Sequence, residues 1–277
     1  MAHQGKFISL VPEGSPHQVV GERVVMLSGI TLEILTTRRI ELDSWILKGL
    51  NDPFWRLYLP VSGQAIMWSG DDAVRTEITL EPGKAYLIPP RTTLHSWNPE
   101  PFSKWYVHFT LGPMGDRATP GIFPLDLTDQ MAAALARLGE PPLAAPFPWA
   151  SAGLVSDALC QLSPEVWTDR QLDARVERAM DFMHANLNRK LTNADVARAA
   201  CLSVRNLNHL FNQHVEMPPM RVLLDFRLDK ACRLLRHSDE SIEQVAEDCG
   251  FPNRYYLSRM LKQHRGTSPA AYRKGQV

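Results

Sequence analysis

The residues best suited to chemistry lie near the end of the chain, in the stretch NRYYLSRMLK. Arg254 and Arg259 each carry a planar guanidinium, and Lys262 adds an ammonium three residues later. A guanidinium can donate two parallel hydrogen bonds to guanine O6 and N7, and either kind of cation can pair with a phosphate. The stretch therefore favours recognition of a polyanion, with Tyr255 and Ser258 as further hydrogen-bonding groups.

A related set of polar residues occurs 50 residues earlier in the chain. Arg205 is followed there by Asn206, Asn208 and His209. An asparagine amide can make a paired hydrogen bond to adenine N6 and N7, as arginine does to guanine. This second set therefore favours the same kind of partner, double-stranded DNA.

The two stretches belong to an internal repeat. The aligned positions are Val196-Ala197 with Val245-Ala246, Leu207 with Leu257, and Phe211 with Leu261. The offset changes from 49 to 50 residues in the turn, where CLS in the first copy corresponds to GFPN in the second. Each copy predicts a short helix, a tight turn and a longer helix. This is the plan of a helix-turn-helix motif, whose second helix enters the major groove.

The longer helix of each copy must hold the polar side chains outward. We expect the first helix over about 204–213 and the second over about 253–263. The residues expected to face mostly inward are Leu207, Leu210, Phe211, Tyr256, Leu257, Met260 and Leu261. The residues left to contact DNA are Arg205, Asn206, Asn208, His209, Arg254, Tyr255, Ser258, Arg259 and Lys262.

Capping residues and a connecting helix fix where the two copies lie. Thr192 and Ser241, the latter with Gln244 three residues on, predict capped starts for the two short helices. Residues 219–236 predict a connecting helix about 27 Å long. Because major-groove segments on one face of DNA lie about 34 Å apart, one chain could contact two of them.

Charge and composition agree with a nucleic-acid partner for the last part of the chain. The 277 residues carry no net charge, but residues 171–277 hold 17 Lys+Arg against 12 Asp+Glu. No stretch predicts a membrane helix and the first 20 residues lack a signal-peptide pattern, so we expect a cytoplasmic protein without a membrane partner. The four cysteines include no CxxC pair and predict reduced, buried thiols.

The first half of the chain has a strand-like sequence pattern, unlike the helical pattern of the last part. From about Val20 to Leu111, short β-forming stretches alternate with turn sequences such as SGQ and EPGK, which predicts a small barrel or sandwich. A helix capped by Thr128 and another over about 150–162 are expected to follow. Residues 163–171 predict a linker.

The sequence IEQVAEDCGFPNRYYLSRMLKQHRGTSPAAYR resembles the C-terminal signature of AraC/XylS-type transcription regulators. The shared positions there are Ile242, Ala246, Gly250-Phe251, Ser258-Arg259, Lys262, Gly266, Ser268-Pro269 and Tyr272-Arg273. Upstream matches are Leu191-Thr192, Ala197, Leu202-Ser203, Leu207, Phe211, Arg227, Ala231 and Leu234-Leu235. The resemblance covers roughly the last 100 residues.

The resemblance implies a multidomain fold that combines α and β structure. Residues 1–124 would form a cupin-like β-barrel that binds a small-molecule effector, preceded by an N-terminal arm. Trailing helices within 125–162 would form a homodimer, and 163–171 would be the linker. Residues 172–277 would form an all-α domain with two helix-turn-helix units joined by a connector helix.

The chain also departs from the family pattern. Glu216 stands where the family usually has Gly, and Asn212 and Gln213 stand where basic residues are usual. The first copy is therefore expected to hold phosphate less firmly than the second.

Aromatic and histidine residues are the candidates for effector contact, namely Tyr58, Trp68, His95 and Trp97. Their rings can stack on sugar faces or planar ligands while their polar atoms orient the ligand, so a sugar is one expected effector.

A metal site would instead need converging histidines and carboxylates. Pro90 and His95 match the spacing of one cupin motif, but Thr92 replaces its Gly, and no HxH motif occurs in WRLYLPVSGQAIMW. We therefore expect no catalytic residue, metal or cofactor.

These observations predict an effector-responsive transcription regulator. If it is an activator, RNA polymerase is a further expected partner. The alternative is a metal-dependent cupin enzyme, or another ligand-binding cupin protein, with an accessory DNA-binding domain.

Overall fold

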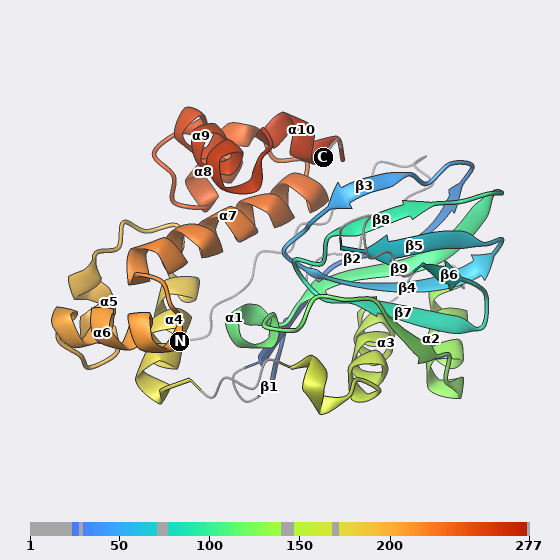
Figure 1. Ribbon diagram of the computed structural model, residues 1–277, viewed down its shortest axis with the longest axis horizontal. Coiled ribbons are helices and arrows are strands. Elements are labelled where there is room, and N and C mark those ends of the chain that lie inside the picture. Colours follow the sequence, from blue (N-terminus) through green and yellow to red (C-terminus); the bar gives the residue numbers. More distant parts are fainter. Residues whose placement is uncertain (1–23, 28–29, 71–76, 140–146, 168–171, 276–277) are drawn as a thin grey trace. The chain divides into compact units, whose positions relative to one another are not determined.

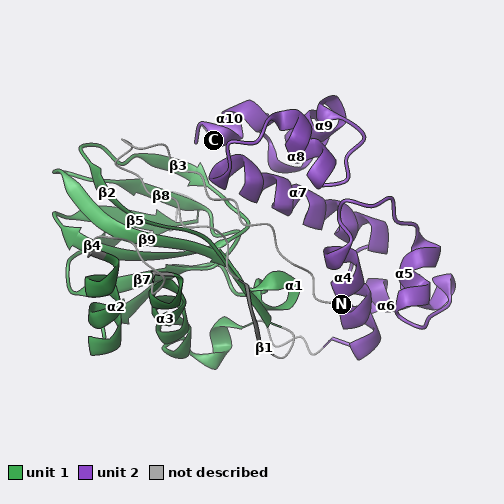
Figure 2. Cartoon of the chain, turned by 180° about the vertical axis from the view of Figure 1, so that it is seen from behind, with its two compact units in different colours: residues 1–168 green, residues 169–277 purple. Residues whose placement is uncertain are grey.

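The computed structural model describes residues 24–27, 30–70, 77–139, 147–167 and 172–275 (Figure 1). The chain forms two compact units, residues 1–168 and 169–277 (Figure 2). The division falls within the predicted linker at 163–171, whose last four residues lie outside the described ranges, as does the predicted N-terminal arm. Residues 164–167 belong to the first unit, where the ring of Trp167 lies 5.6 Å from that of Trp55.

The described residues of the first unit form ten antiparallel strands. They are β1 Val24–Leu27, β2 Ile30–Leu42, β3 Leu47–Leu50, β4 Trp55–Ser62, β5 Ala65–Ser69, β6 Ile78–Leu80, β7 Lys84–Ile88, β8 Leu94–Trp97, β9 Phe102–Thr110 and β10 Phe123–Asp126. They form a six-stranded sheet in the order β1-β2-β9-β4-β7-β10 and a four-stranded sheet in the order β3-β8-β5-β6.

The strand-rich first unit is confirmed, but the closed barrel is not. Among the described residues neither sheet closes on itself: β1 and β10 are the edges of the larger sheet, and β3 and β6 those of the smaller. Strand β10 also crosses the expected boundary between residues 124 and 125, because Phe123 to Asp126 pair with β7.

Alternation along the central strands gives the larger sheet two different faces. On one face Trp55, Leu57 and Leu59 of β4 join Val107 and Phe109 of β9 in a core cluster. Two helices cover this face, α2 (Asp129–Gly139) and α3 (Phe147–Cys160) (Figure 1). Their buried residues in the same cluster are Met131, Ala134, Leu138, Ala150, Leu154, Val155 and Ala158.

The predicted cap of the first of these helices is confirmed. The Thr128 hydroxyl accepts a hydrogen bond from the Met131 backbone N–H at 3.1 Å and donates to the Asp157 carboxylate of α3. One side chain therefore both starts α2 and ties it to α3.

The opposite face of the larger sheet belongs to a second cluster. Tyr58, Tyr86 and Phe102 from the larger sheet pack there with Met67 and Leu94 from the smaller one. The inner face of the first unit, which takes the even-numbered residues of β4 and β9, is therefore partly aromatic and polar rather than wholly aliphatic.

The second unit is helical, as predicted. Its helices are α4 Ala174–Ala185, α5 Asn193–Ala199, α6 Val204–His214, α7 Pro219–His237, α8 Ile242–Asp248, α9 Arg254–Arg265 and α10 Pro269–Arg273. Thr192 with Asp195, and Ser241 with Gln244, form complete capping boxes at the starts of α5 and α8. The two predicted helix-turn-helix units are thus α5–α6 and α8–α9, with α7 as the connector between them (Figure 1).

Each copy of the repeat uses left-handed backbone at the same two places. In the turn between the paired helices, Cys201 has φ 57° and Gly250 has φ 70°. After the second helix of each pair, Glu216 has φ 61° and Gly266 has φ 74°. The family's usual glycine at residue 216 is thereby explained, since a left-handed residue is required there and glycine adopts that conformation without strain.

Gly250 is also the point where three elements meet. A Cβ atom on this residue would lie 2.2 Å from the Leu187 carbonyl oxygen and 2.9 Å from the Arg227 guanidinium. Arg227 of α7 donates to the backbone carbonyls of Leu187 at 2.9 Å and Arg189 at 2.6 Å, just beyond α4. The turn of the second copy, the connector helix and the end of α4 are therefore held at one position.

Two of the four thiols differ from the prediction. Cys232 and Cys249 are buried in the core of the second copy, but Cys160 and Cys201 are exposed. Cys201 is exposed because it occupies the tight turn rather than a helix face. Within the described ranges, no helix combines the length and apolar character that a membrane crossing requires.

Gly250→Ala is expected to lower the free energy of unfolding of the second unit by about 3 kcal/mol. The new methyl group must displace backbone and adopt a strained φ angle. Gly266→Ala is the matched control, because its φ is similar but its Cβ would meet open space; it should cost about 1 kcal/mol. Chemical denaturation followed by circular dichroism measures both, and equal losses would contradict the proposed close approach at Gly250.

Candidate DNA-binding interface

Helix α6 separates its apolar and polar residues as predicted. Leu207, Leu210 and Phe211 are buried, whereas Arg205 and Asn206 are exposed. His209 is exposed as well, and Asn208 is half-buried. The Asn208 amide donates to the Val204 carbonyl oxygen one turn earlier at 2.9 Å, so its side chain lies along the helix.

Helix α9 presents a more basic face. Asn253 is its N-cap and accepts from the Tyr256 backbone N–H at 2.9 Å. Arg254 lies 3.9 Å from the Glu243 carboxylate of α8 and donates to the Tyr255 hydroxyl at 3.1 Å. These two contacts hold the guanidinium at the N-terminal end of the helix, and its pKa is raised by the hydrogen bond to Tyr255.

The other predicted residues of α9 lie on the same side. Arg259 and Lys262 are exposed, and Ser258 is half-buried. The Ser258 hydroxyl donates to the Arg254 carbonyl oxygen at 2.8 Å, in the same way that Asn208 bonds back to Val204 in the first copy. The repeat therefore extends to the hydrogen bonding of these equivalent side chains.

The inward orientation expected for Tyr256 is wrong. Its side chain is 38% exposed, and its ring lies 4.8 Å from the Arg259 guanidinium carbon and 6.2 Å from the Phe251 ring. Leu257, Met260 and Leu261 already fill the space toward the core, so the ring packs along the surface instead. Tyr256 thereby orients Arg259, a role that helical spacing alone did not indicate.

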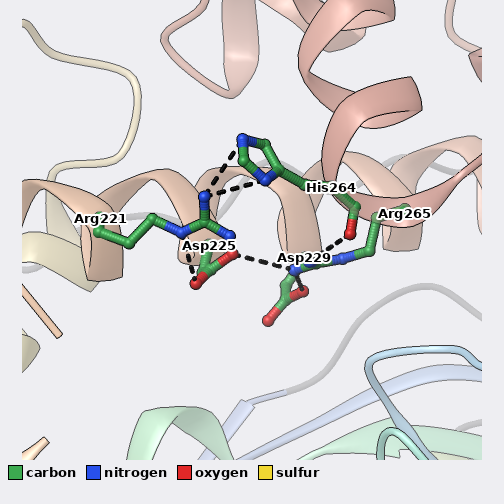
Figure 3. Close-up of polar contacts among 5 residues, drawn as sticks. All are labelled: Arg221, Asp225, Asp229, His264 and Arg265. Atoms are coloured by element: carbon green, nitrogen blue, oxygen red, sulfur yellow. Dashed lines mark hydrogen bonds and ion pairs between the residues drawn. The ribbon is translucent and has the colours of Figure 1, made fainter. Parts of the chain in front are cut away.

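A cluster of charged residues fixes the C-terminal end of α9 against α7. Figure 3 shows Arg265 of α9 between two carboxylates of α7, 2.8 Å from Asp229 and 3.4 Å from Asp225. Arg221 of α7 lies 3.4 Å from Asp225 and 2.9 Å from a ring nitrogen of His264. These five residues (Arg221, Asp225, Asp229, His264 and Arg265) are called the α7–α9 cluster below.

The electrostatics of the cluster favour a fixed arrangement. Partial burial and the charge of Arg221 lower the pKa of His264, which leaves a neutral ring nitrogen to accept from Arg221. Burial tends to lower the pKa of Arg265, but Asp229 and Asp225 outweigh this effect and raise it. Arg265, the third arginine of α9, is thus used to fix the helix, while Arg254 and Arg259 face outward.

The four residues predicted to contact an effector do not gather in one place. Trp68 of β5 pairs with His95 of β8, and their rings stack at 5.1 Å. Their neighbours Met67 and Ser96 lie on the other face of the smaller sheet, with Met67 in the inner cluster. Alternation therefore places Trp68, His95 and the exposed Trp97 on one face, while Tyr58 lies inside the unit.

His95 and His108 of the strand-rich unit also do not converge. The His95 ring accepts from the Gly49 backbone N–H at 3.3 Å, whereas His108 lies 4.8 Å from Tyr106 on the larger sheet. In the part of the chain that the structure describes, no group of three His, Cys, Asp or Glu residues could hold a metal ion.

Comparison with known proteins agrees with this arrangement. A family model described as a helix-turn-helix domain matches residues 196–275, which include α6 to α10. The C-terminal region is a helix-turn-helix domain of the AraC type.

Curated relatives of this AraC-type domain are transcriptional activators by name. The HTH-type transcriptional activator RhaS of Escherichia fergusonii is 32% identical over 108 residues, which are 39% of each chain. RhaS of Enterobacter sp. strain 638 is 34% identical over 104 residues, which are 38% of this chain and 37% of RhaS. The chain thus matches about two fifths of the length of these relatives.

A solved structure resembles more of the chain. ToxT from Vibrio cholerae aligns over 87% of this chain and 98% of its own, with a TM-score of 0.54 and 13% identity. Another ToxT structure, described as bound to an unsaturated fatty acid, aligns over 86% of this chain and 94% of its own at a TM-score of 0.51 and 12% identity. At this identity the likeness shows a common fold: a strand-rich N-terminal region and a helical C-terminal domain.

Arg265→Met is expected to lower the free energy of unfolding of the AraC-type domain by about 2–4 kcal/mol, because it leaves Asp225 and Asp229 without their shared cation. Adding Asp229→Asn should recover part of this loss, which a double-mutant cycle by denaturation measures. Lys262→Met, one turn earlier and exposed, is the matched control and should stay within about 0.5 kcal/mol of the wild type. Strictly additive losses would contradict the proposed coupling.

Proposed function

We propose that the chain is a sequence-specific transcription regulator of the AraC type that responds to a small molecule. The observation that carries the proposal is the duplicated helix-turn-helix arrangement on one connector helix. Both longer helices turn hydrogen-bonding or cationic side chains outward, and these are the groups that recognise base edges and phosphates.

The connector helix sets the geometry of binding. Helix α7 has 19 residues, which corresponds to about 28 Å. With one helix-turn-helix unit on each side of it, α6 and α9 would enter successive major-groove segments, whose centres lie about 34 Å apart. The two DNA segments that the chain contacts would then lie about one helical turn apart, centre to centre.

The residues of this surface would contact either base edges or phosphates. Arg205, Arg254 and Arg259 can donate paired hydrogen bonds to guanine, and Asn206 can pair with adenine. Asn208 and Ser258 already donate to their own helix, so each can accept from a base amino group with its oxygen, and the second N–H of the Asn208 amide can still donate. Tyr255, His209 and Lys262 complete the surface, with Lys262 placed for a phosphate near the end of α9.

The strand-rich first unit would bind the effector. The likeness in fold to ToxT, a structure of which holds an unsaturated fatty acid, supports a small-molecule ligand for this unit. Binding would shift the population of chains whose DNA-binding domains can occupy their sites. A homodimer formed through α2 and α3, and activation through contact with RNA polymerase, are further parts of this proposal, and the RhaS names support activation.

Arg259→Ala is expected to weaken binding to the preferred DNA by about 1–3 kcal/mol and to relax the preference at one base position. Lys262→Ala should weaken binding to all sequences alike and reduce the slope of log K against log salt by about one. Fluorescence anisotropy with a site selected from random DNA measures both effects.

Arg178→Ala, on the exposed side of α4, is the matched control and should leave both quantities unchanged. A uniform loss on all sequences for Arg259→Ala would exclude base contact by this residue. If the wild-type chain showed no sequence preference at all, the proposed function would be wrong.

A further inference from the structure

The inner face of the larger sheet contains a lysine in an unusual environment. Lys104 of β9 is 3% exposed, and it lies on the same side of the strand as Phe102 and Tyr106. Among the described residues, no carboxylate pairs with it. An ammonium group held away from water without a counter-charge is costly, so such a residue calls for an explanation.

Aromatic rings surround the Lys104 amine. Its Nζ atom lies 3.2 Å from the ring centre of Trp45, 3.5 Å from that of Tyr58 and 6.0 Å from that of Phe102. The Trp45 and Phe102 rings stack at 5.7 Å, and Tyr58 meets Trp45 edge-on at 5.6 Å. Cation–π contacts offset part of the cost of burial, and a full opposite charge would offset more.

The protein anchors this arrangement with dedicated hydrogen bonds. Trp45 lies in the connection between β2 and β3, and its backbone N–H donates to the Asn98 side chain at 2.5 Å. Asn98 in turn donates to the carbonyls of Leu42, Asp43 and Glu100. Ser96 of β8 donates to the Trp45 carbonyl at 3.3 Å. The ring over the amine is therefore positioned by contacts from β8 and from the residue that directly follows it.

The surrounding groups add positive charge instead of neutralising it. Arg56, on the same face of β4 as Tyr58, pairs with the buried Asp52 at 2.5 Å. Arg38 of β2 hydrogen-bonds to the Tyr106 hydroxyl, and its Nε atom is buried without a hydrogen-bond partner. In the part of the unit that the structure describes, three cations (Arg38, Arg56 and Lys104) thus share this face with one carboxylate, Asp52.

Burial and a neighbouring cation both disfavour the charged form of the Lys104 amine. Burial lowers the pKa of Lys104 well below its usual value, and the charge of Arg56 lowers it further. An anion placed beside the amine would oppose both effects and raise the pKa, since it would favour the charged form.

We propose that this inner face binds a small molecule that carries a carboxylate, with Lys104 as the group that pairs with it. The inference rests on the proposed function, because this molecule would be the effector. The carboxylate supplies the negative counter-charge for Lys104 and Arg38. The rings of Tyr58 and Tyr106 contact the apolar part of the bound molecule. The recognition element is therefore the β9 lysine and its aromatic cage, not the stacked Trp68 and His95 on the other face of the smaller sheet.

The test compares acids with matched neutral amides on the full-length chain. Sodium benzoate and sodium octanoate are titrated alongside benzamide and octanamide, and thermal unfolding of the first unit is recorded. Both acids should raise the unfolding midpoint in proportion to the logarithm of concentration, while the amides should not. Equal effects of acids and amides, or no effect of either acid up to millimolar concentration, would overturn the proposal.

Lys104→Met separates ligand binding from a purely structural role. The variant should lose the preference for acid over amide, with at least about a tenfold weaker affinity for the acids. It should also be at least as stable as the wild type without ligand, because a buried amine has been removed. Lys48→Met, an exposed lysine of β3, should keep the wild-type preference. If Lys104→Met kept that preference, the inference would fail.

Sequence-preferring DNA binding is measured on the same preparations without ligand. If the wild-type chain showed no such DNA binding, the proposed function would be contradicted, while the inference of a carboxylate site would stand. Retained DNA binding with no acid preference would contradict the site alone. Should Lys104→Met not fold, the comparison of acids with amides on the wild type still decides the question.

Discussion

The second unit depends on the close approach of backbone at Gly250. The turn of the second helix-turn-helix, the carbonyl of Leu187 and the guanidinium of Arg227 occupy one small volume, which no side chain on residue 250 could share. Because Arg227 belongs to α7, this contact fixes the connector helix relative to α4 and to the second copy together. The α7–α9 cluster then fixes the far end of α9. The outward residues of α9 are therefore held by rigid neighbours.

The helical unit could be predicted in detail because its signals are local. Capping boxes at Thr192 and Ser241, the prolines that start α7 and α10, and apolar residues at helical spacing each depend on a few neighbouring residues. Because the unit is duplicated, each element of one copy also indicates its counterpart in the other copy. Two expectations for this unit were wrong: Cys201 is exposed in the tight turn, and Tyr256 lies along the surface because Leu257, Met260 and Leu261 already fill the core. Helical periodicity predicts the side of the helix on which a side chain lies. Whether the core has room for that side chain depends on how its neighbours pack.

The strand-rich unit was less predictable because its contacts are distant in sequence. Short strands were expected, but neither their order in two sheets nor the open edges follows from alternation. The candidate effector residues were chosen by type, and the register of β5 with β8 then placed Trp68 and His95 away from Tyr58. In the sequence FSKWYVHF, Lys104 lies two residues from both Phe102 and Tyr106, so strand alternation places a cation on the face that these aromatic residues share.

The central claim is that one chain contacts two successive major-groove segments through α6 and α9 on a shared helix. Selection of preferred sites from random DNA by the full-length protein, followed by insertion of about half a helical turn between the selected segments, tests it most directly. The account predicts two preferred segments about 10 base pairs apart, centre to centre, and loss of specific binding on insertion of about 5 base pairs. A single short preferred segment, or binding that tolerates the insertion, would contradict it.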